Sequence, residues 1–255
     1  MPSAAPEPRS VILTYHSIDG HGSVLSVNPD TFRRQLEWLA SSRIPVAPLS
    51  QIRRHPGAVA LTFDDGYRNF AEVAWPLLRR YGFPATVFVV AGKVGGRNDW
   101  PALGHAMPPL ELMDWDEIRS VVREGAEAGS HDLTHAPYLP LLEEAELRER
   151  LKASRAILEG RLGAPVRSFA YPYGKVSARL RRAVADCYET GCTTELDFVG
   201  SGADPWLLPR IDVYYLRSLF WFRRLLRPSG FLYLRLRKGL RHLRKGILAE
   251  EPVSP

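Results

Sequence analysis

Short apolar runs alternate with helical stretches along most of the chain, and this alternation limits the fold more than any other feature. A β-branched run at residues 11–18 precedes a helical pattern at 29–40, in which apolar residues recur at helical spacing behind a capping asparagine. The later strand and helix pairs are 58–63 with 69–81, 84–90 with 114–124, 126–130 with 141–162, and 168–171 with 177–186, followed by strands at 188–194 and 206–213. This order predicts a mostly parallel sheet covered by helices.

Polar side chains follow directly after several of the predicted strands. His16, Asp64, Asp65, His131 and the segment 171–173 each come after the C-terminal end of a strand. A (β/α) barrel gathers such residues on one face, whereas an open sheet uses fewer strand ends at one crevice. We therefore expect an α/β barrel in which these residues meet.

The first candidate site motif is a pair of adjacent carboxylates, Asp64 and Asp65, between an apolar strand and Gly66. Burial of two like charges side by side is costly unless a cation or hydrogen bonds compensate. An isolated Asp-Asp-Gly sequence is also typical of a simple turn. The motif alone leaves both interpretations open.

The second motif contains His131 and His135, which are four residues apart in the segment Ser-His-Asp-Leu-Thr-His. This spacing lets two imidazoles face the same way, although surface histidines also fall at it by chance. Together with Asp65, the histidines form a set of three protein ligands with an open position for water, as in catalytic metal sites. A bound divalent ion lowers the pKa of water toward about 7, and Asp64 is then the natural base.

The third motif spans residues 167–174 and reads Arg-Ser-Phe-Ala-Tyr-Pro-Tyr-Gly. Its proline and glycine predict an irregular backbone after a strand, where a loop can aim an N–H group at an oxyanion. We expect Arg167 to pair with Asp64 and Tyr173 to offer its N–H to the developing negative charge. As an isolated segment, the motif is more typical of a simple turn.

In this order the three motifs resemble the signatures of the polysaccharide deacetylases, carbohydrate esterase family four, which share the nodulation-type deacetylase homology domain. The motifs stand at residues 62–66, 130–135 and 167–174, and the resemblance runs from about residue 11 to 213. It implies a distorted (β/α)7 barrel that removes acetyl groups from N-acetylated sugars. The implied cofactor is a divalent metal, Zn²⁺ first and Co²⁺ or Ni²⁺ as alternatives.

The resemblance assigns a role to each matching position. Asp64 matches the general base, Arg167 the residue that orients the base, and Tyr173 the oxyanion donor. We expect Pro172 and Tyr171, in the same motif, to bind substrate. The positions that match the metal ligands are Asp65, His131 and His135.

The general acid departs from the usual pattern of the family, a histidine in a Leu-x-x-His motif near the end of the domain. No such motif follows the third signature, and His242 lies in the basic C-terminal tail. The segment 15–18, Tyr-His-Ser-Ile, resembles instead the biofilm-polysaccharide deacetylase branch, in which the acid histidine comes early. We therefore predict His16 as the acid, with a packing histidine as the alternative, and Arg210 and Asp212 as supporting residues.

Positive charge is concentrated near the C-terminus. The net charge is only +6, yet residues 216–249 contain ten Lys or Arg and no acidic residue, interleaved with leucines and aromatic residues. We expect a catalytic domain at 11–214 and a basic amphipathic tail at 215–255. The tail either contacts an anionic membrane surface or packs on the barrel. Nucleic-acid binding is not expected, because no recognition motif accompanies the charge.

Residues 1–10 are predicted to be a flexible segment without the basic start and apolar run of a secretory signal. The sequence contains no run of about 18 uncharged apolar residues, so it predicts no transmembrane helix. The expected location is the cytoplasm, and attachment to the inner face of the membrane is left open. Cys187 and Cys192 show no metal or disulfide spacing and are expected to be structural thiols.

The favoured function is a metal-dependent de-N-acetylase that acts on a polysaccharide, an oligosaccharide or a lipid-linked glycan, for example an exopolysaccharide. A second possibility is an amide hydrolase that acts on a non-sugar acetamide, because the motifs specify no part of the substrate beyond its acetamide group. A catalytically silent carbohydrate-binding barrel also remains open. The complete set of ligands and base argues against it, since a silent site is free to lose Asp64.

Overall fold

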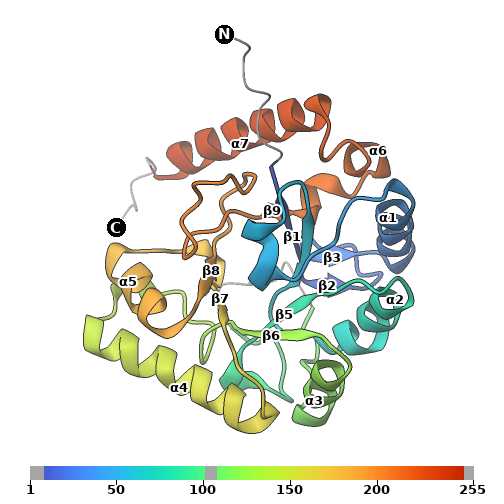
Figure 1. Cartoon of the computed structure of the whole chain (residues 1–255). Coiled ribbons are helices and arrows are strands. Elements are labelled where there is room, and N and C mark those ends of the chain that lie inside the picture. Colours follow the sequence, from blue (N-terminus) through green and yellow to red (C-terminus); the bar gives the residue numbers. More distant parts are fainter. Residues whose placement is uncertain (1–8, 101–107, 250–255) are drawn as a thin grey trace.

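The computed structural model describes residues 9–100 and 108–249 of the chain. Seven parallel strands form a curled sheet in the order β8-β7-β6-β5-β4-β1-β9, with helices around its outside (Figure 1). The strands are β1 (Val11–Tyr15), β4 (Val59–Phe63), β5 (Thr86–Val89), β6 (Glu127–Ser130), β7 (Ser168–Ala170), β8 (Thr190–Cys192) and β9 (Ile211–Asp212). The predicted distorted (β/α)7 barrel is confirmed.

A ring of helices surrounds this sheet, and short helical turns and a small second sheet fill the connections. The α-helices are α1 (Pro29–Ser42), α2 (Trp75–Arg80), α3 (Trp115–Arg123), α4 (Glu144–Leu162), α5 (Ala178–Cys187), α6 (Leu219–Phe222) and α7 (Pro228–Ala249). The turns are η1 (Leu49–Arg54), η2 (Phe70–Ala74), η3 (Ala91–Lys93), η5 (Leu139–Leu141), η6 (Pro172–Gly174) and η7 (Val213–Leu216), and the second sheet pairs β2 (Ser17–Ile18) with β3 (Ser26–Val27). None of the helices within the described ranges is long and apolar enough to cross a bilayer.

Local signals in the sequence explain where the helices begin and end. The side chain of Asn28 accepts a hydrogen bond from the Asp30 N–H at the start of α1, and a proline stands at the first helical position. Asp114 and Glu117 form a reciprocal capping box at the start of α3. Gly163 ends α4 in the left-handed conformation that a glycine adopts at little cost. The helix ends marked by these signals therefore agree with the predicted pattern.

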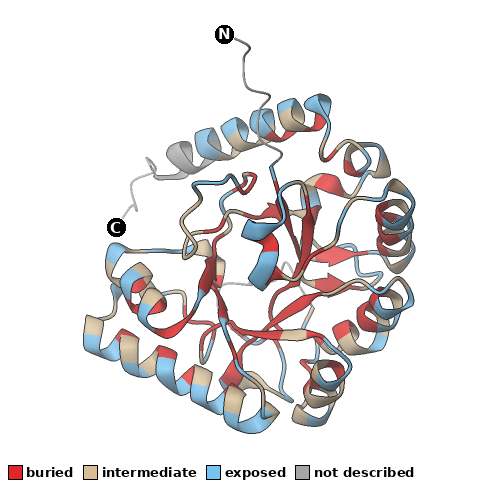
Figure 2. Cartoon of the chain, viewed as in Figure 1, coloured by how far each residue is buried: buried red, intermediate tan, exposed pale blue. Residues whose placement is uncertain are grey.

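The central strands β1 and β4 are buried along their whole length (Figure 2). They pair in parallel from Val11 with Val59 to Tyr15 with Phe63, so both strands end at the same level. The Tyr15 ring stacks on Phe63 at a centroid distance of 5.1 Å. This register places the residues that follow β1 and β4, His16 and Asp64, at the same end of the barrel.

The predicted strand at 206–213 is wrong in its extent, because this segment changes partner along its length. Leu208 forms a bridge with Cys192 of β8, whereas Ile211–Asp212 pairs with β1. Pro209 stands between them and has no N–H to continue a ladder. The barrel is thus closed by an irregular segment.

Two predicted helices also differ from the structure. The pattern at 69–81 contains the π-helical turn η2 before α2, and Pro76, in the first turn of α2, lacks the N–H of a regular α-helical ladder. The pattern at 141–162 begins later, at Glu144, because a separate turn ends at Leu141. Neither difference moves a residue of the predicted site.

The C-terminal helices α6 and α7 close the ring between α1 and α5 (Figure 1). One side of α7 packs on the barrel, and its outer side is exposed (Figure 2). At the other end of the chain, Ser10 pairs with Val199, and the remaining residues of the predicted flexible segment, 1–8, lie outside the described ranges.

Candidate active site

A cavity of about 420 Å³ lies at the carboxyl end of the strands. Its lining includes His16 after β1, Asp64 and Asp65 after β4, His131 after β6 and Tyr173 after β7. Residues far apart in the sequence therefore meet at one place because parallel strands end on the same face of the barrel.

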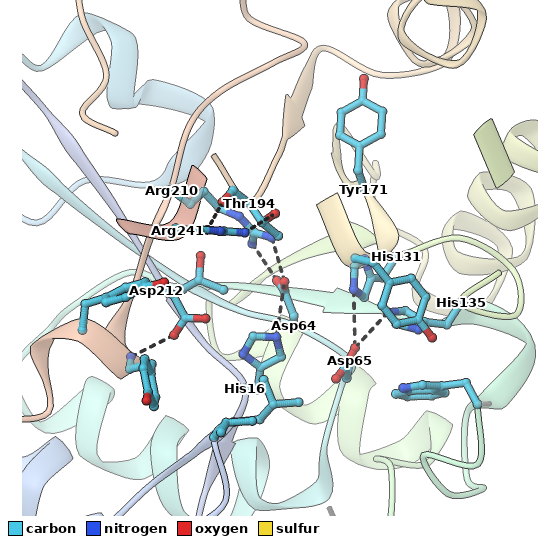
Figure 3. A pocket seen from close by; sticks show the side chains of 17 residues that line it. His16, Asp64, Asp65, His131, His135, Tyr171, Thr194, Arg210, Asp212 and Arg241 are labelled. Carbon is cyan, nitrogen blue, oxygen red and sulfur yellow. Dashed lines mark hydrogen bonds and ion pairs between the residues drawn. The ribbon is translucent and has the colours of Figure 1, made fainter. Parts of the chain in front are cut away.

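Asp65, His131 and His135 form a compact cluster on one side of the cavity (Figure 3). The Nε2 atoms of His131 and His135 lie 3.4 Å and 3.5 Å from Oδ1 of Asp65. The Nδ1 atom of His131 lies 2.8 Å from the carbonyl oxygen of Ala170, which makes Nδ1–H the donor and directs Nε2 toward Asp65. One potential ligand atom from each residue lies within 4.8 Å of the other two.

The chemistry of these donors fits a divalent cation. Oδ1 of Asp65 is buried and has no hydrogen-bond partner within the described part of the chain. Burial alone would raise the pKa of Asp65, but the neighbouring His131 and His135 imidazoles hold it below its usual value, so the carboxylate is ionised. Burial and the nearby His131 lower the pKa of His135 to about 4, which keeps this imidazole in the neutral form that binds metals.

Asp132, between the two histidines, organises the loop that carries them. Its carboxylate accepts hydrogen bonds from the N–H groups of Thr134 and Ala136 at 3.2 Å and 3.0 Å. Arg150 of α4 donates to both carboxylate oxygens, at 2.6 Å and 2.8 Å. The loop that sets the direction of His131 and His135 is therefore tied to α4 by a partly buried charged pair.

Strained backbone is concentrated around this cluster. Asp65, Asp132, His135 and Tyr173 have φ angles of 73°, 69°, 58° and 58°, in the left-handed region that non-glycine residues rarely adopt. The one other such residue in the described ranges is Arg43, which ends α1. Conformations of this kind cost about 1–3 kcal/mol each and persist only where surrounding contacts impose them, as they do at functional sites.

Asp64 occupies the other side of the cavity, where it is neutralised by a protein cation. The Arg210 guanidinium donates two hydrogen bonds of 2.7 Å to the two carboxylate oxygens, and its Nε–H donates to the Thr193 carbonyl at 2.9 Å. Burial would raise the pKa of Asp64, but Arg210 and His131 hold it below its usual value. Nε2 of His16 lies 3.9 Å from Oδ2 of Asp64 (Figure 3).

The prediction that Arg167 pairs with Asp64 is wrong. Arg167 precedes β7, and the start of a parallel strand lies at the opposite end of the barrel from the cavity. Its half-exposed side chain lies 3.5 Å from Oε1 of Glu189. Arg210 takes the place at Asp64 because β9 pairs with the later part of β1, so that the Arg210 side chain extends inside the barrel. The sequence prediction named Arg210 only as a supporting residue.

The third motif contributes backbone groups to the cavity more clearly than it contributes side chains. Tyr173 lines the cavity, its ring centroid is 4.4 Å from that of His135, and its N–H donates to no backbone acceptor within the described ranges. Tyr171 also borders the cavity, but its ring points away from Asp65 and its hydroxyl donates to the Trp206 carbonyl (Figure 3). Pro172 is buried in η6. Substrate binding by Tyr171 and Pro172 stays a prediction.

The cavity is also lined by residues outside the three sequence motifs. Arg241 of α7 donates to the carbonyl and hydroxyl oxygens of Thr194, at 2.7 Å and 3.2 Å, and lines the cavity. The Trp100 ring lies 4.6 Å from the His135 ring. Asp212, predicted as a supporting residue, lines the cavity and accepts a hydrogen bond from the Tyr214 N–H. The charge pattern marked the tail that carries Arg241 but gave no sign of where it packs.

Fold and cavity together define a barrel enzyme with a candidate metal centre beside a buried ionised carboxylate. Residues 51–190 match the family model described as polysaccharide deacetylase, which covers more than half of the chain. The chain therefore belongs to the polysaccharide deacetylase family and is a hydrolase of that type. The family predicted from the three motifs is confirmed.

Relatives with names and solved structures agree with this assignment. The chain is 24% identical over 211 residues to YxkH of Bacillus subtilis (strain 168), and the match covers 79% of this chain and 70% of that protein. It is 31% identical over 139 residues to the poly-beta-1,6-N-acetyl-D-glucosamine N-deacetylase of Escherichia coli (strain K12), which covers 48% of this chain but only 20% of that enzyme. The structure of IcaB from Ammonifex degensii has the same fold, with a TM-score of 0.74, 22% identity, and coverage of 88% of this chain and 98% of that one.

Proposed function

We propose that the chain is a metal-dependent de-N-acetylase that hydrolyses the acetamide groups of an N-acetylated polysaccharide, oligosaccharide or lipid-linked glycan. A polymer of β-1,6-linked N-acetylglucosamine is the first candidate, because relatives from Escherichia coli and Staphylococcus aureus carry that substrate in their names. The observation that carries the proposal is the placement of Asp64, paired with Arg210, beside the Asp65, His131 and His135 cluster in one cavity.

Asp65, His131 and His135 would hold the metal. Two imidazoles and one carboxylate, with no fourth protein ligand among the described residues, match the ligand set of catalytic Zn²⁺ sites, and Co²⁺ or Ni²⁺ suit the same donors. When bound, the ion supplies Lewis acidity and makes a water nucleophilic near neutral pH. Asp132 and Arg150 keep the two histidines directed toward Asp65.

Asp64 is the general base in this proposal. Hydrolysis adds the oxygen of water to the acetyl carbon, so a proton must leave that water, and an ionised carboxylate next to the ligand cluster is placed to accept it. Arg210 holds both carboxylate oxygens of Asp64, which fixes its orientation and keeps it ionised without making it a metal ligand. Arg210 is thus a positioning residue.

His16 is the general acid. The carbon–nitrogen bond breaks only when the leaving amine gains a proton, and His16 lines the same cavity on the side of Asp64. The Tyr173 N–H is the donor for the negative charge that develops on the acetyl oxygen, because its backbone turns into the left-handed region and leaves this N–H without a backbone acceptor. Acetate and a free amine are the products.

The substrate class is tested by measuring acetate release from three compounds, at equal acetamide concentration. These are β-1,6-linked N-acetylglucosamine oligomers, β-1,4-linked oligomers, and an N-acetylated alkyl amine. The proposal predicts turnover of a sugar oligomer and little turnover of the alkyl acetamide. Faster hydrolysis of the alkyl acetamide would favour a non-sugar amide hydrolase on the same site.

A further inference from the structure

The outer side of α7 carries a stripe of exposed leucines. Leu232, Leu236, Leu240 and Leu243 are 61%, 62%, 54% and 65% exposed. Their spacing of four, four and three residues places all of them on one face of the helix, over about 16 Å of its length. Figure 2 shows this side of α7 turned away from the barrel. Exposed leucines in a continuous row mark an interaction site more often than leucines scattered singly.

The opposite side of α7 fixes this orientation. Leu234 is buried against the barrel, the Tyr233 ring stacks on Trp221 at 4.1 Å, and Nζ of Lys238 lies 2.7 Å from Oε1 of Glu195. Leu234 and Lys238 fall on the face opposite the leucines, and Tyr233 lies on the flank between the two faces. The two interpretations of the basic tail therefore combine, since α7 packs on the barrel with one face and leaves an apolar face outside.

The charges near the stripe identify its partner. Residues 216–249 contain ten Lys or Arg and no acidic residue. Arg223, Arg227 and Arg235 are exposed, and none of them forms an ion pair within the described part of the chain. An exposed apolar row and exposed, unpaired arginines in one basic segment are the pattern of a helix that lies in the plane of an anionic lipid surface. A second copy of the chain is a poorer fit, because it would bring two such basic segments together.

We propose that the outer face of α7, defined by Leu232, Leu236, Leu240 and Leu243, docks the enzyme on an anionic lipid bilayer. The leucines enter the boundary between headgroups and acyl chains, and the nearby arginines contact lipid phosphates. Arg241, on the inner side of the same helix, lines the catalytic cavity. Docking through α7 therefore keeps the cavity close to the bilayer, where a glycan held at the membrane surface would reach it.

The test is co-sedimentation of the full chain with vesicles of phosphatidylcholine alone and with vesicles containing phosphatidylglycerol. The wild type is expected to pellet with the anionic vesicles and to remain largely in solution with the neutral ones. The variant Leu236→Ser with Leu240→Ser should lower the partition coefficient about tenfold, because two apolar side chains no longer enter the bilayer. The matched control is Leu141→Ser, since Leu141 is 76% exposed on the separate turn η5.

A second variant tests the charge independently. Arg223→Gln with Arg235→Gln should weaken binding to anionic vesicles and reduce its dependence on salt. Acetate release from a soluble oligomer should stay at the wild-type rate in every variant, which separates loss of docking from loss of folding. The proposal would be overturned if the wild type did not co-sediment with anionic vesicles. Equal binding of the leucine variant and the Leu141→Ser control would also overturn it. If light scattering shows that the wild type is a dimer and that the leucine variant is a monomer, the stripe would be assigned to contact with a second copy instead.

Discussion

The charges of two neighbouring carboxylates are compensated by different groups on the two sides of the cavity. Asp64 and Asp65 are adjacent, and each is only 3% exposed. Asp64 has its charge matched by two hydrogen bonds from Arg210, whereas Asp65 faces two histidines and its Oδ1 accepts no hydrogen bond within the described residues. The protein supplies the cation for Asp64, and in the proposed mechanism a metal ion supplies it for Asp65. This contrast is the basis for proposing a base and a ligand, although the two residues have the same chemistry.

The substitution His16→Gln is expected to have a large effect on the rate of acetate release. Loss of a general acid lowers kcat by about 10²–10⁴-fold, and the metal content should not change because His16 lies on the Asp64 side of the cavity. Acetate release and metal analysis on the same sample measure both. His55→Gln changes an exposed histidine immediately after η1; this control should behave as wild type. Loss of metal from His16→Gln would place this residue on the ligand side.

The next largest effect is expected for Arg210→Met. This change leaves Asp64 buried without a cation and should lower the free energy of unfolding by about 3–5 kcal/mol, measured by denaturant unfolding of metal-free protein. Arg167→Met, which removes only a half-exposed pair with Glu189, should cost at most about 1 kcal/mol. Equal effects of the two substitutions would contradict the assignment of Arg210 to Asp64.

The pH dependence of stability in the Arg210→Met variant tests the charge pairing of Arg210 with Asp64. The folded-state pKa of Asp64 is lowered, so Asp64 stabilises the wild type above its unfolded-state pKa, and this contribution is lost as the pH falls through the folded-state pKa. Without Arg210, burial raises the pKa of Asp64 and stability falls as the pH rises above about 4. The gap in stability between wild type and variant should therefore narrow on acidification. A gap that is constant from pH 7 to pH 3 would exclude charge pairing as its cause.

A smaller effect is expected on the ligand side for Arg150→Met. Asp132 would lose its partner, and the loop with His131 and His135 would be held less firmly. Metal affinity should fall about 10–100-fold, as for other residues that orient ligands, which a competition titration with a chelator can measure. Arg148→Met on the same helix α4 is the control, because Arg148 pairs with Glu144 and Asp186 away from the cavity.

The smallest effect is expected for Tyr173→Phe. The Tyr173 hydroxyl is buried without a partner within the described residues, so its removal should leave stability within about 1 kcal/mol. Acetate release should change less than about threefold, because the proposed donor is the backbone N–H. Tyr173→Pro, which removes this N–H, also disturbs the left-handed backbone and is therefore a poorer test. A large loss of rate in Tyr173→Phe would assign the role to the hydroxyl.

Sequence reasoning found the parts of the site that depend on position along a strand. Asp65, His131 and His135 follow strand ends, and parallel strands bring their ends to one face whatever the details of packing. The strands and the family followed from periodicity and from the order of the motifs. These features are local, so a single sequence contains them.

The parts that sequence reasoning missed depend on register and docking. Arg167 and Arg210 both flank strands, and only the pairing of β9 with the later part of β1 decides which guanidinium reaches Asp64. Pro209 interrupts the strand predicted at 206–213, and the sequence did not show that only Ile211–Asp212 pairs with β1. The contact of Arg241 with Thr194 depends on how α7 docks, which the periodicity of α7 does not specify.

The division between base and ligand is tested most directly by two matched variants, Asp64→Asn and Asp65→Asn, analysed for bound metal and for acetate release from N-acetylglucosamine oligomers. Both substitutions keep the shape of the side chain and remove one charge. Our account predicts that Asp64→Asn retains about one metal ion per chain yet loses activity by at least about 10²-fold, whereas Asp65→Asn loses both. Loss of metal from Asp64→Asn with retention in Asp65→Asn, or a wild type that binds no metal, would contradict it.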